Sequence, residues 1–224
     1  MTVKITAANG GSDSLDFGCA QTAIVATVTG TEVSSGEGKL ELKTTTGGTS
    51  AAKLTIAANG TVTLASPALS NVVIQLQTAV ASTSGTSIDF TGIPANVKRV
   101  SVLYSGVSVS GTSNLQIQLG TSGGIVTSGY ASGIGYRTGE AASTAGFMVA
   151  GPSGAASLWS GVVTINSFGS DIWTSGGTMS RDDGWASLSG GYKDLGGTLT
   201  QIRITTINGS DTFDAGSVNI SWEF

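Results

Sequence analysis

The stretch GKLELKTTTGGTSAAKLTIAANGTVTLAS, residues 38–66, repeats one pattern three times: an alternating apolar pair followed by a short break of small or polar residues. The pairs are Leu40 and Leu42, Leu54 and Ile56, and Val62 and Leu64. Alternation puts both members of a pair on one face of a strand, and Asn-Gly suits the tight turn of a hairpin. The stretch therefore predicts short antiparallel strands with little bulk to bury between them.

The composition of the whole chain agrees with a β-rich protein. Glycine makes up 34 of the 224 residues. Charged residues make up 11% of the chain, well below the ~25% of an average soluble domain. Apolar residues reach 39% and the net charge is −4, which is not the signature of disorder. We therefore expect an all-β fold whose solubility comes from hydroxyl groups and exposed backbone.

Longer alternating strands are expected in the second half of the chain. Their inward positions are Val100, Val102 and Tyr104; Leu115, Ile117 and Leu119; Ile202 and Ile204; and Val218, Ile220, Trp222 and Phe224. Leaving a large apolar side chain in water costs roughly 1.5 to 3 kcal/mol. The last of these strands is therefore predicted to lie in the core.

The two halves of the chain differ in their large side chains, which suggests different roles. Residues 1–66 contain no Trp or Tyr, and Phe17 is their one aromatic residue. Hairpins without bulky residues do not close a core of their own, but they can stack on identical strands of other chains around a symmetry axis. We expect an N-terminal attachment and β-hairpin stem over 1–66, a connecting strand or linker over 67–83, and a C-terminal β-sandwich over 84–224.

Several function classes are disfavoured by residue content. The chain has no histidine and one cysteine, Cys19, which argues against His-dependent nucleophilic catalysis, the common zinc sites and a disulfide scaffold. Ten scattered Lys and Arg form no basic stripe for nucleic acid. No signal peptide and no run of 18 apolar residues is evident, so we expect assembly in a cytoplasm without membrane insertion. No cofactor and no metal site is expected.

Residues 84–224 resemble the distal β-sandwich of bacteriophage tail-fibre and related virion proteins. The motifs that carry the resemblance are IDFTGIP at 88–94, VKRVSVLYSGVS at 97–108, LQIQLG at 115–120 and the closing GSVNISWEF at 216–224. The hairpin pattern of 38–66 resembles the segments that often precede such tips. Between about 137 and 195 the chain follows no matching pattern.

The resemblance implies a structural virion protein, usually a homotrimer, whose jelly-roll-like tip contacts the host surface. We therefore expect a short tail fibre that binds other virion proteins through its N-terminal region and a host receptor, for which polysaccharide is a candidate, through its C-terminal domain. The alternative is a head fibre or capsid decoration protein with no specific ligand. An enzyme such as a depolymerase ranks third, because adjacent Asp182 and Asp183 point to opposite faces of a strand.

Two segments are candidates for host or glycan contact. Residues 171–197, DIWTSGGTMSRDDGWASLSGGYKDLGG, combine aromatic rings, which lie against sugar C–H surfaces, with carboxylates that accept hydrogen bonds from hydroxyls. Residues 128–140, SGYASGIGYRTGE, are a second candidate. The candidate residues are Trp173, Arg181, Asp182, Asp183, Trp185, Tyr192, Tyr130, Tyr136 and Arg137. A buried role for the aromatic residues and a polar turn at SRDDGW stay open as alternatives.

Overall fold

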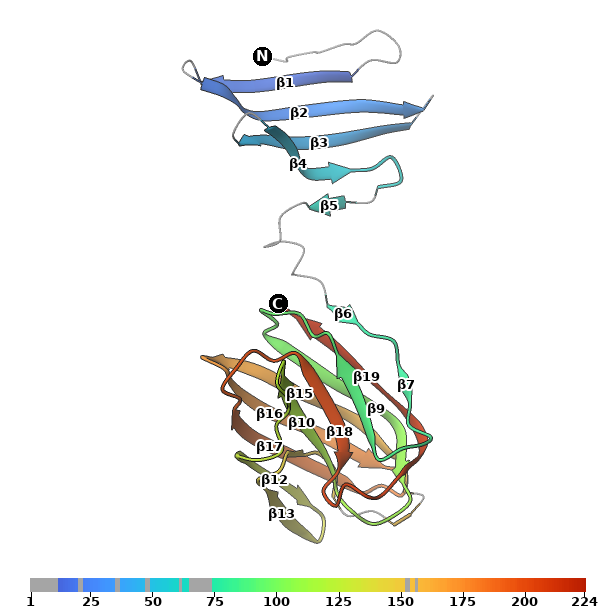
Figure 1. Cartoon of the computed structure of the whole chain (residues 1–224). Helices are drawn as coiled ribbons and strands as arrows, with labels where there is room; N and C mark the ends of the chain where they lie inside the picture. The colour runs from blue at the N-terminus through green and yellow to red at the C-terminus, as the bar shows by residue number, and fades with distance from the viewer. Residues whose placement is uncertain are drawn as a thin grey trace. The chain divides into compact units, whose positions relative to one another are not determined.

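The protein is all-β over the part of the chain that the computed structural model describes. These residues are 12–19, 22–34, 37–46, 49–60, 62–64, 74–151, 154–155 and 157–224. The chain divides into two compact units, Met1–Val72 and Val73–Phe224. Figure 1 shows strands and turns, with no helix among the described residues. The expected all-β class, with several antiparallel sheets, is therefore confirmed.

The first unit contains one five-stranded antiparallel sheet in which consecutive strands are neighbours. Its strands are β1 (Ser12–Cys19), β2 (Thr22–Ser34), β3 (Glu37–Thr46), β4 (Thr49–Ile56) and β5 (Val62–Leu64). The repeated pattern of residues 38–66 accounts for β3, β4 and β5, as expected from its alternation. The side chain of Cys19 lies outside the described part.

The apolar pairs of these strands lie opposite one another across the sheet. Leu42 pairs with Leu54, and Leu40 pairs with Ile56, which in turn pairs with Val62. Paired residues share a face, so these five form one apolar face. Leu40 and Leu42 are each 40% exposed and Val62 is 57% exposed. The apolar face is therefore incompletely covered within one chain.

The opposite face of the same sheet carries charged side chains. Glu41 lies between two lysines, 3.2 Å from the Nζ of Lys39 and 3.1 Å from the Nζ of Lys43. The hydrogen bond from Lys43 is the largest cause that lowers the pKa of the Glu41 carboxyl. The sheet is therefore two-sided, with a hydrocarbon face and a charged face.

The second unit contains two antiparallel sheets. Its strands are β6 (Gln75–Leu76), β7 (Val80–Ala81), β8 (Ser87–Thr91), β9 (Arg99–Val109), β10 (Leu115–Thr121), β11 (Gly124–Ile125), β12 (Tyr130–Tyr136), β13 (Gly139–Ser143), β14 (Phe147–Met148), β15 (Trp159–Gly169), β16 (Ile172–Arg181), β17 (Ala186–Asp194), β18 (Gln201–Thr206) and β19 (Phe213–Glu223). One sheet has the order β13-β12-β17-β16-β15-β9-β19-β6, with β7 also paired to β19. The other has the order β11-β10-β18-β8, with β14 paired to β10.

A single hydrophobic core joins the two sheets of the second unit. The alternating residues expected in the sequence supply much of it: Val100 and Val102 from β9, Ile117 from β10, and Ile202 and Ile204 from β18 are all fully buried. Within this core the rings of Tyr130 and Phe147 meet edge to face at 5.1 Å. The alternation in sequence therefore predicts the inward faces of both sheets.

The C-terminal strand β19 lies inside its sheet, between β9 and the short strands β6 and β7. Trp222 is 4% exposed, and Phe224 is partly buried against the core. The prediction of a buried closing strand is therefore confirmed.

The chain joins the second unit alongside β19, before residue 84, where the sequence places the start of the C-terminal domain. Ser82 is fully buried, and its N–H and Oγ–H donate to the carbonyl oxygens of Gly216 at 2.9 Å and Ala215 at 2.7 Å. The second half of segment 67–83 is thus bound to the second unit. The sequence predicts a connecting strand or linker for this segment.

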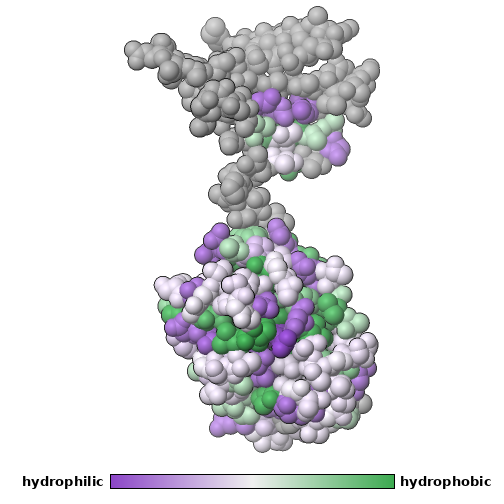
Figure 2. All heavy atoms as spheres, in the orientation of Figure 1, coloured by the Kyte–Doolittle hydropathy of each residue, from purple (hydrophilic) through white to green (hydrophobic). Residues whose placement is uncertain are grey.

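The surface of the second unit reflects the low charge of the sequence. Figure 2 shows a face dominated by pale residues of intermediate hydropathy, the range of Gly, Ser and Thr, with smaller hydrophilic and hydrophobic patches. No helix long and apolar enough to cross a membrane occurs in the described residues.

Candidate functional site

Strand pairing brings two tryptophans and an arginine side by side at one end of the nine-stranded sheet. Trp159 begins β15 and pairs with Arg181, the last residue of β16. The backbone N–H of Arg181 donates to the carbonyl oxygen of Trp185 at 2.7 Å, which places Trp185 next in the row. Cross-strand neighbours of this kind share a face of the sheet. The side chains of Trp159, Arg181 and Trp185 therefore lie on the core-facing side of the sheet, at the end where the core reaches the surface.

Two guanidinium groups lie over the Trp185 ring. Arg181 is 4.4 Å from the ring centroid and Arg137, from the turn between β12 and β13, is 4.6 Å from it. Arg181 also lies 5.7 Å from the Trp159 ring. Each such contact is worth ~0.5–1 kcal/mol when exposed and ~2 kcal/mol when desolvated. We call Arg137, Arg181, Asp183 and Trp185 the arginine–tryptophan cluster.

The turn SRDDGW holds Asp183 against Arg181. The Nε–H of Arg181 donates to Asp183 Oδ1 at 2.8 Å, and a second guanidinium nitrogen donates to Oδ2. Gly184 has a φ of 84°, and its N–H closes the turn on the carbonyl oxygen of Arg181. Only glycine adopts such a φ at little cost. The hydrogen bond from Arg181 lowers the pKa of Asp183, and the same bond raises the pKa of Arg181.

The other candidate residues at this end of the sheet are exposed or half-buried. Asp182 is exposed and exchanges two hydrogen bonds with Leu158, one through its N–H at 3.0 Å and one through Oδ1 at 3.3 Å. Tyr136 is half-buried, and a Cβ placed on Gly151 would lie 3.0 Å from its ring. Arg137 is exposed, and its guanidinium has no hydrogen-bond partner among the described residues. Arg137 therefore has donors to offer a ligand.

The cluster lies at the end of the second unit opposite the point where the chain enters. Leu76 and Gln75 of β6 pair with the last residues of β19, and Glu223 of β19 pairs with Arg99. Strand β15 runs from Trp159 at the cluster to Asn166, which pairs with Arg99. Figure 1 shows the β12–β13 hairpin far from β6 and the C-terminus.

Three of the residues expected at a contact site lie elsewhere. Trp173 is 5% exposed at the other end of β16, and Tyr130 is 3% exposed in the core. The hydroxyl of Tyr130 accepts from the N–H of Leu119 at 2.7 Å, and burial raises its pKa to about 12. Tyr192 is exposed but points away from the core, because it is one residue from buried Lys193.

Most of residues 171–197 is strand, so loops within this segment are confined to its short turns and ends. Residues 172–181 and 186–194 are strands β16 and β17, and they pair along their whole length. The exposed turn between them spans Asp182 to Gly184. Period-two alternation then separates the aromatic residues onto two faces and two ends of the sheet.

Sequence reasoning missed Trp159 as a neighbour of the candidate residues. Trp159 is 1% exposed and supports Arg181 from the core side. Its one signal in sequence is the alternation of β15, in which Trp159, Val163 and Ile165 are buried. No group of three or more metal-ligating side chains occurs in the part of the chain that the structure describes.

The Arg181–Asp183 pair gives a prediction for titration. Because the pKa of Asp183 is lowered, the pair is complete above the ordinary aspartate pKa of about 3.9 and is lost as the pH falls through the lower folded value. A ¹³C NMR titration of the Asp183 carboxyl is expected to have its midpoint below the ordinary value in the wild type. The midpoint should return toward that value in Arg181→Gln. Equal midpoints in the two proteins would contradict the pairing.

No family model, no curated protein and no solved structure matches this chain.

Proposed function

We propose that the chain is a short bacteriophage tail fibre whose second unit contacts the host cell surface during adsorption. The observation that carries the proposal is the arginine–tryptophan cluster, which lies at the end opposite the point where the chain enters the unit. The resemblance of residues 84–224 to fibre tips supports it. On this proposal the two sheets form a jelly-roll-like β-sandwich, and the first unit attaches the fibre to other virion proteins.

The chemistry of the cluster favours an anionic ligand group over the stacking of a sugar on Trp185. Two guanidinium groups already lie over the Trp185 ring, so its surface is less open to a sugar C–H face than an uncovered ring. Arg137 keeps its N–H donors, and an arginine fork matches a carboxylate or phosphate. Asp182 and Asp183 are exposed, and carboxylate oxygens can accept hydrogen bonds from ligand hydroxyls in addition to those made within the chain. The proposed receptor is therefore a host polysaccharide that bears acidic groups.

A test on Arg137 separates contact from folding. Binding of the fluorescently labelled full chain to host cells should fall by about tenfold or more in Arg137→Ala, because a hydrogen bond to a charged group contributes ~1.5–3 kcal/mol. The melting temperature should change little, since Arg137 is exposed. Trp185→Ala should weaken binding as well, because it removes the ring that orients Arg137.

The control for this test is Arg203→Ala. Arg203 is also partly exposed and pairs with Asp89 on the outer face of the second unit's β11-β10-β18-β8 sheet, away from the cluster. This variant should bind cells as the wild type does. Full binding by a folded Arg137→Ala protein would rule out the cluster as the contact site. For Trp185→Ala, a large melting loss would mean that the ring is structural.

The exposed apolar face of the first unit supports self-association as a homotrimer. Leu40, Leu42 and Val62 together leave a hydrocarbon surface on a sheet with a charged opposite face. Three identical faces packed around an axis would remove that surface from water, which is favourable at ~25 cal/mol per Å². On this proposal the first unit contributes most of the contact between subunits.

The trimer prediction is tested by sedimentation equilibrium on the full chain. The wild type should have three times the mass of one chain, and Leu42→Asp should shift the mass toward the monomer, because it places a charge in the proposed interface. Thr63→Asp is the matched control, since Thr63 lies in register on the other face. A monomeric wild type would contradict the stem interface.

A head fibre or capsid decoration protein is the second candidate. This candidate is supported by the contacts of the cluster, which are made within one chain. The cluster therefore also closes this end of the core without a ligand. Antibody labelling of virions separates the candidates, because the tail-fibre proposal requires signal at the tail and the alternative requires it at the capsid.

A further inference from the structure

A hollow lies at the end of the second unit where the chain enters it, opposite the arginine–tryptophan cluster. It is a cavity of about 200 Å³ formed by residues 94–98 before β9, the β15–β16 turn, Trp173, and residues 198–199 before β18. The walls are joined by backbone hydrogen bonds. The N–H of Ser167 donates to the carbonyl oxygen of Lys98 at 2.8 Å. The N–H of Ile93 donates to the carbonyl oxygen of Thr200 at 3.0 Å. The cavity is therefore built from segments held in fixed positions.

Trp173 is the large aromatic residue that lines this cavity. Its side chain is almost entirely buried, and its indole Nε1–H has no hydrogen-bond partner among the described residues. A buried donor without a partner costs ~1–3 kcal/mol. Trp159 and Trp222 also have unpartnered indole N–H groups, but they do not line the cavity. Trp173 is the one of the three whose side chain lines the cavity, but its indole nitrogen is itself buried, so the ring and not the N–H borders the open space.

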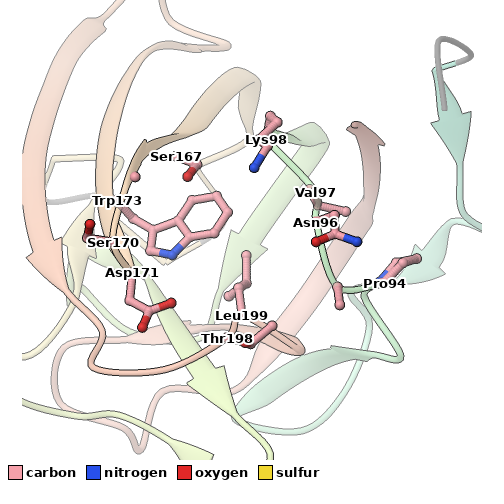
Figure 3. A pocket seen from close by; sticks show the side chains of 12 residues that line it. Pro94, Asn96, Val97, Lys98, Ser167, Ser170, Asp171, Trp173, Thr198 and Leu199 are labelled. Atoms are coloured by element: carbon pink, nitrogen blue, oxygen red, sulfur yellow. The ribbon is translucent and has the colours of Figure 1, made fainter. Parts of the chain in front are cut away.

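The rim of the cavity holds further polar side chains without partners in the described structure. In Figure 3 the side chains of Trp173 and Lys98 reach toward the space between the loops, and Asn96, Asp171 and Thr198 border it. These side chains comprise one amine, one carboxylate, an amide and a hydroxyl. The charges of Lys98 and Asp171 cancel, so the site offers both donors and acceptors without a net preference for an ion.

Backbone conformation also distinguishes this rim. Three non-glycine residues of the described chain have a positive φ: Asn96 at 75°, Ser170 at 49° and Asp171 at 63°. All three line the cavity. Asn and Asp adopt this region more readily than other non-glycine residues, and Ser170 and Asp171 form the two-residue turn between β15 and β16.

We propose that this cavity binds a single neutral sugar residue. A sugar hydroxyl both donates and accepts, so neighbouring hydroxyls can accept from Lys98 while donating to Asp171, both of which are exposed at the cavity. The volume is below the ~300–1,000 Å³ of sites for drug-sized ligands, which suits one ring. The cavity is separate from the arginine–tryptophan cluster, because Trp173 and Arg181 are eight residues apart on β16, about 26 Å at ~3.3 Å per residue.

The test follows the indole N–H signals of the ¹⁵N-labelled full chain, which has four tryptophans. Glucose, galactose, mannose and N-acetylglucosamine are titrated separately, and Trp173→Phe assigns the Trp173 signal. We expect a saturable shift of that signal with at least one sugar and no shift of Trp159 or Trp222. Lys98→Met and Asp171→Asn should each raise the apparent dissociation constant threefold or more, and Asp89→Asn, outside the cavity, should leave it unchanged.

The opposite results are equally clear. The proposal is overturned by the absence of a saturable Trp173 shift with all four sugars, or by affinities unchanged in both Lys98→Met and Asp171→Asn. A shift with acetate or inorganic phosphate but with no sugar would make the site an anion site and also overturn it. A shift confined to Trp185 would locate sugar binding at the cluster, support host contact there and overturn the cavity proposal.

Discussion

Trp159→Ala is expected to lower the free energy of unfolding of the second unit by about 3–5 kcal/mol, the cost of replacing a core aromatic residue by alanine. Trp159 is 1% exposed and is among the largest fully buried side chains of the described residues. The change would leave a cavity between the two sheets and remove the ring beneath Arg181. Urea denaturation followed by circular dichroism measures the loss.

Trp159→Phe is the control for this experiment. It retains an aromatic ring and removes the indole N–H, which has no partner in the described structure. We therefore expect a much smaller loss than for alanine. A loss below about 1 kcal/mol for Trp159→Ala would be too small for a fully packed core aromatic residue and would contradict the packing.

Gly216→Ala is expected to destabilise the second unit by about 3 kcal/mol, which combines ~1–3 kcal/mol for a strained residue with ~1–3 kcal/mol for overpacking. Gly216 has a φ of 88°, and a Cβ there would lie 2.3 Å from the carbonyl oxygen of Gly106. That atom is backbone in β9. Gly106 lies at an irregularity in both ladders, but its neighbours Ser105 and Val107 pair with Ser217 and Trp159, which limits how far it can move.

Gly196→Ala separates the two contributions. Gly196 has a φ of 68°, and a Cβ there would meet nothing within 4 Å. Its substitution should therefore cost ~1–2 kcal/mol for the left-handed backbone alone. Comparing the thermal unfolding midpoints of the two variants isolates the clash at Gly106. Equal losses would show that the β9–β19 pair can separate to admit a methyl group.

Alternation in the sequence predicts the core strands well, because burial of every second residue is a local property. Val100 and Val102, or Ile202 and Ile204, are recognisable without knowledge of their neighbours. The glycine pairs in β16 and β17 are different. A Cβ on Gly177 would lie 2.6 Å from the carbonyl oxygen of Val162, and one on Gly191 would lie 2.6 Å from the ring of Phe147. These glycines let neighbouring segments approach the strands closely. In the sequence alone, such glycine pairs are typical of loops.

The candidate site was harder to predict than the fold, because it depends on register. Arg137 and Trp185 meet because β12 pairs with β17, and Trp185 and Arg181 meet because β17 pairs with β16. Residue type identified all three as candidates. Residue type did not show that Trp173, with the same chemistry, lies at the other end of β16.

The way the chain joins the second unit has a mechanical consequence. Strands β6 and β7 run antiparallel to β19, so a pull on Ile74 against an anchor at Arg137 acts along the strands. The N–H of Gln77 bonds to Ile220 at 2.9 Å, the Nδ2–H of Asn219 bonds to the carbonyl oxygen of Gln77 at 2.8 Å, and the N–H of Ser82 bonds to Gly216 at 2.9 Å. Because β6 and β7 slide along β19 under such a load, these bonds are strained together in shear and do not open one after another.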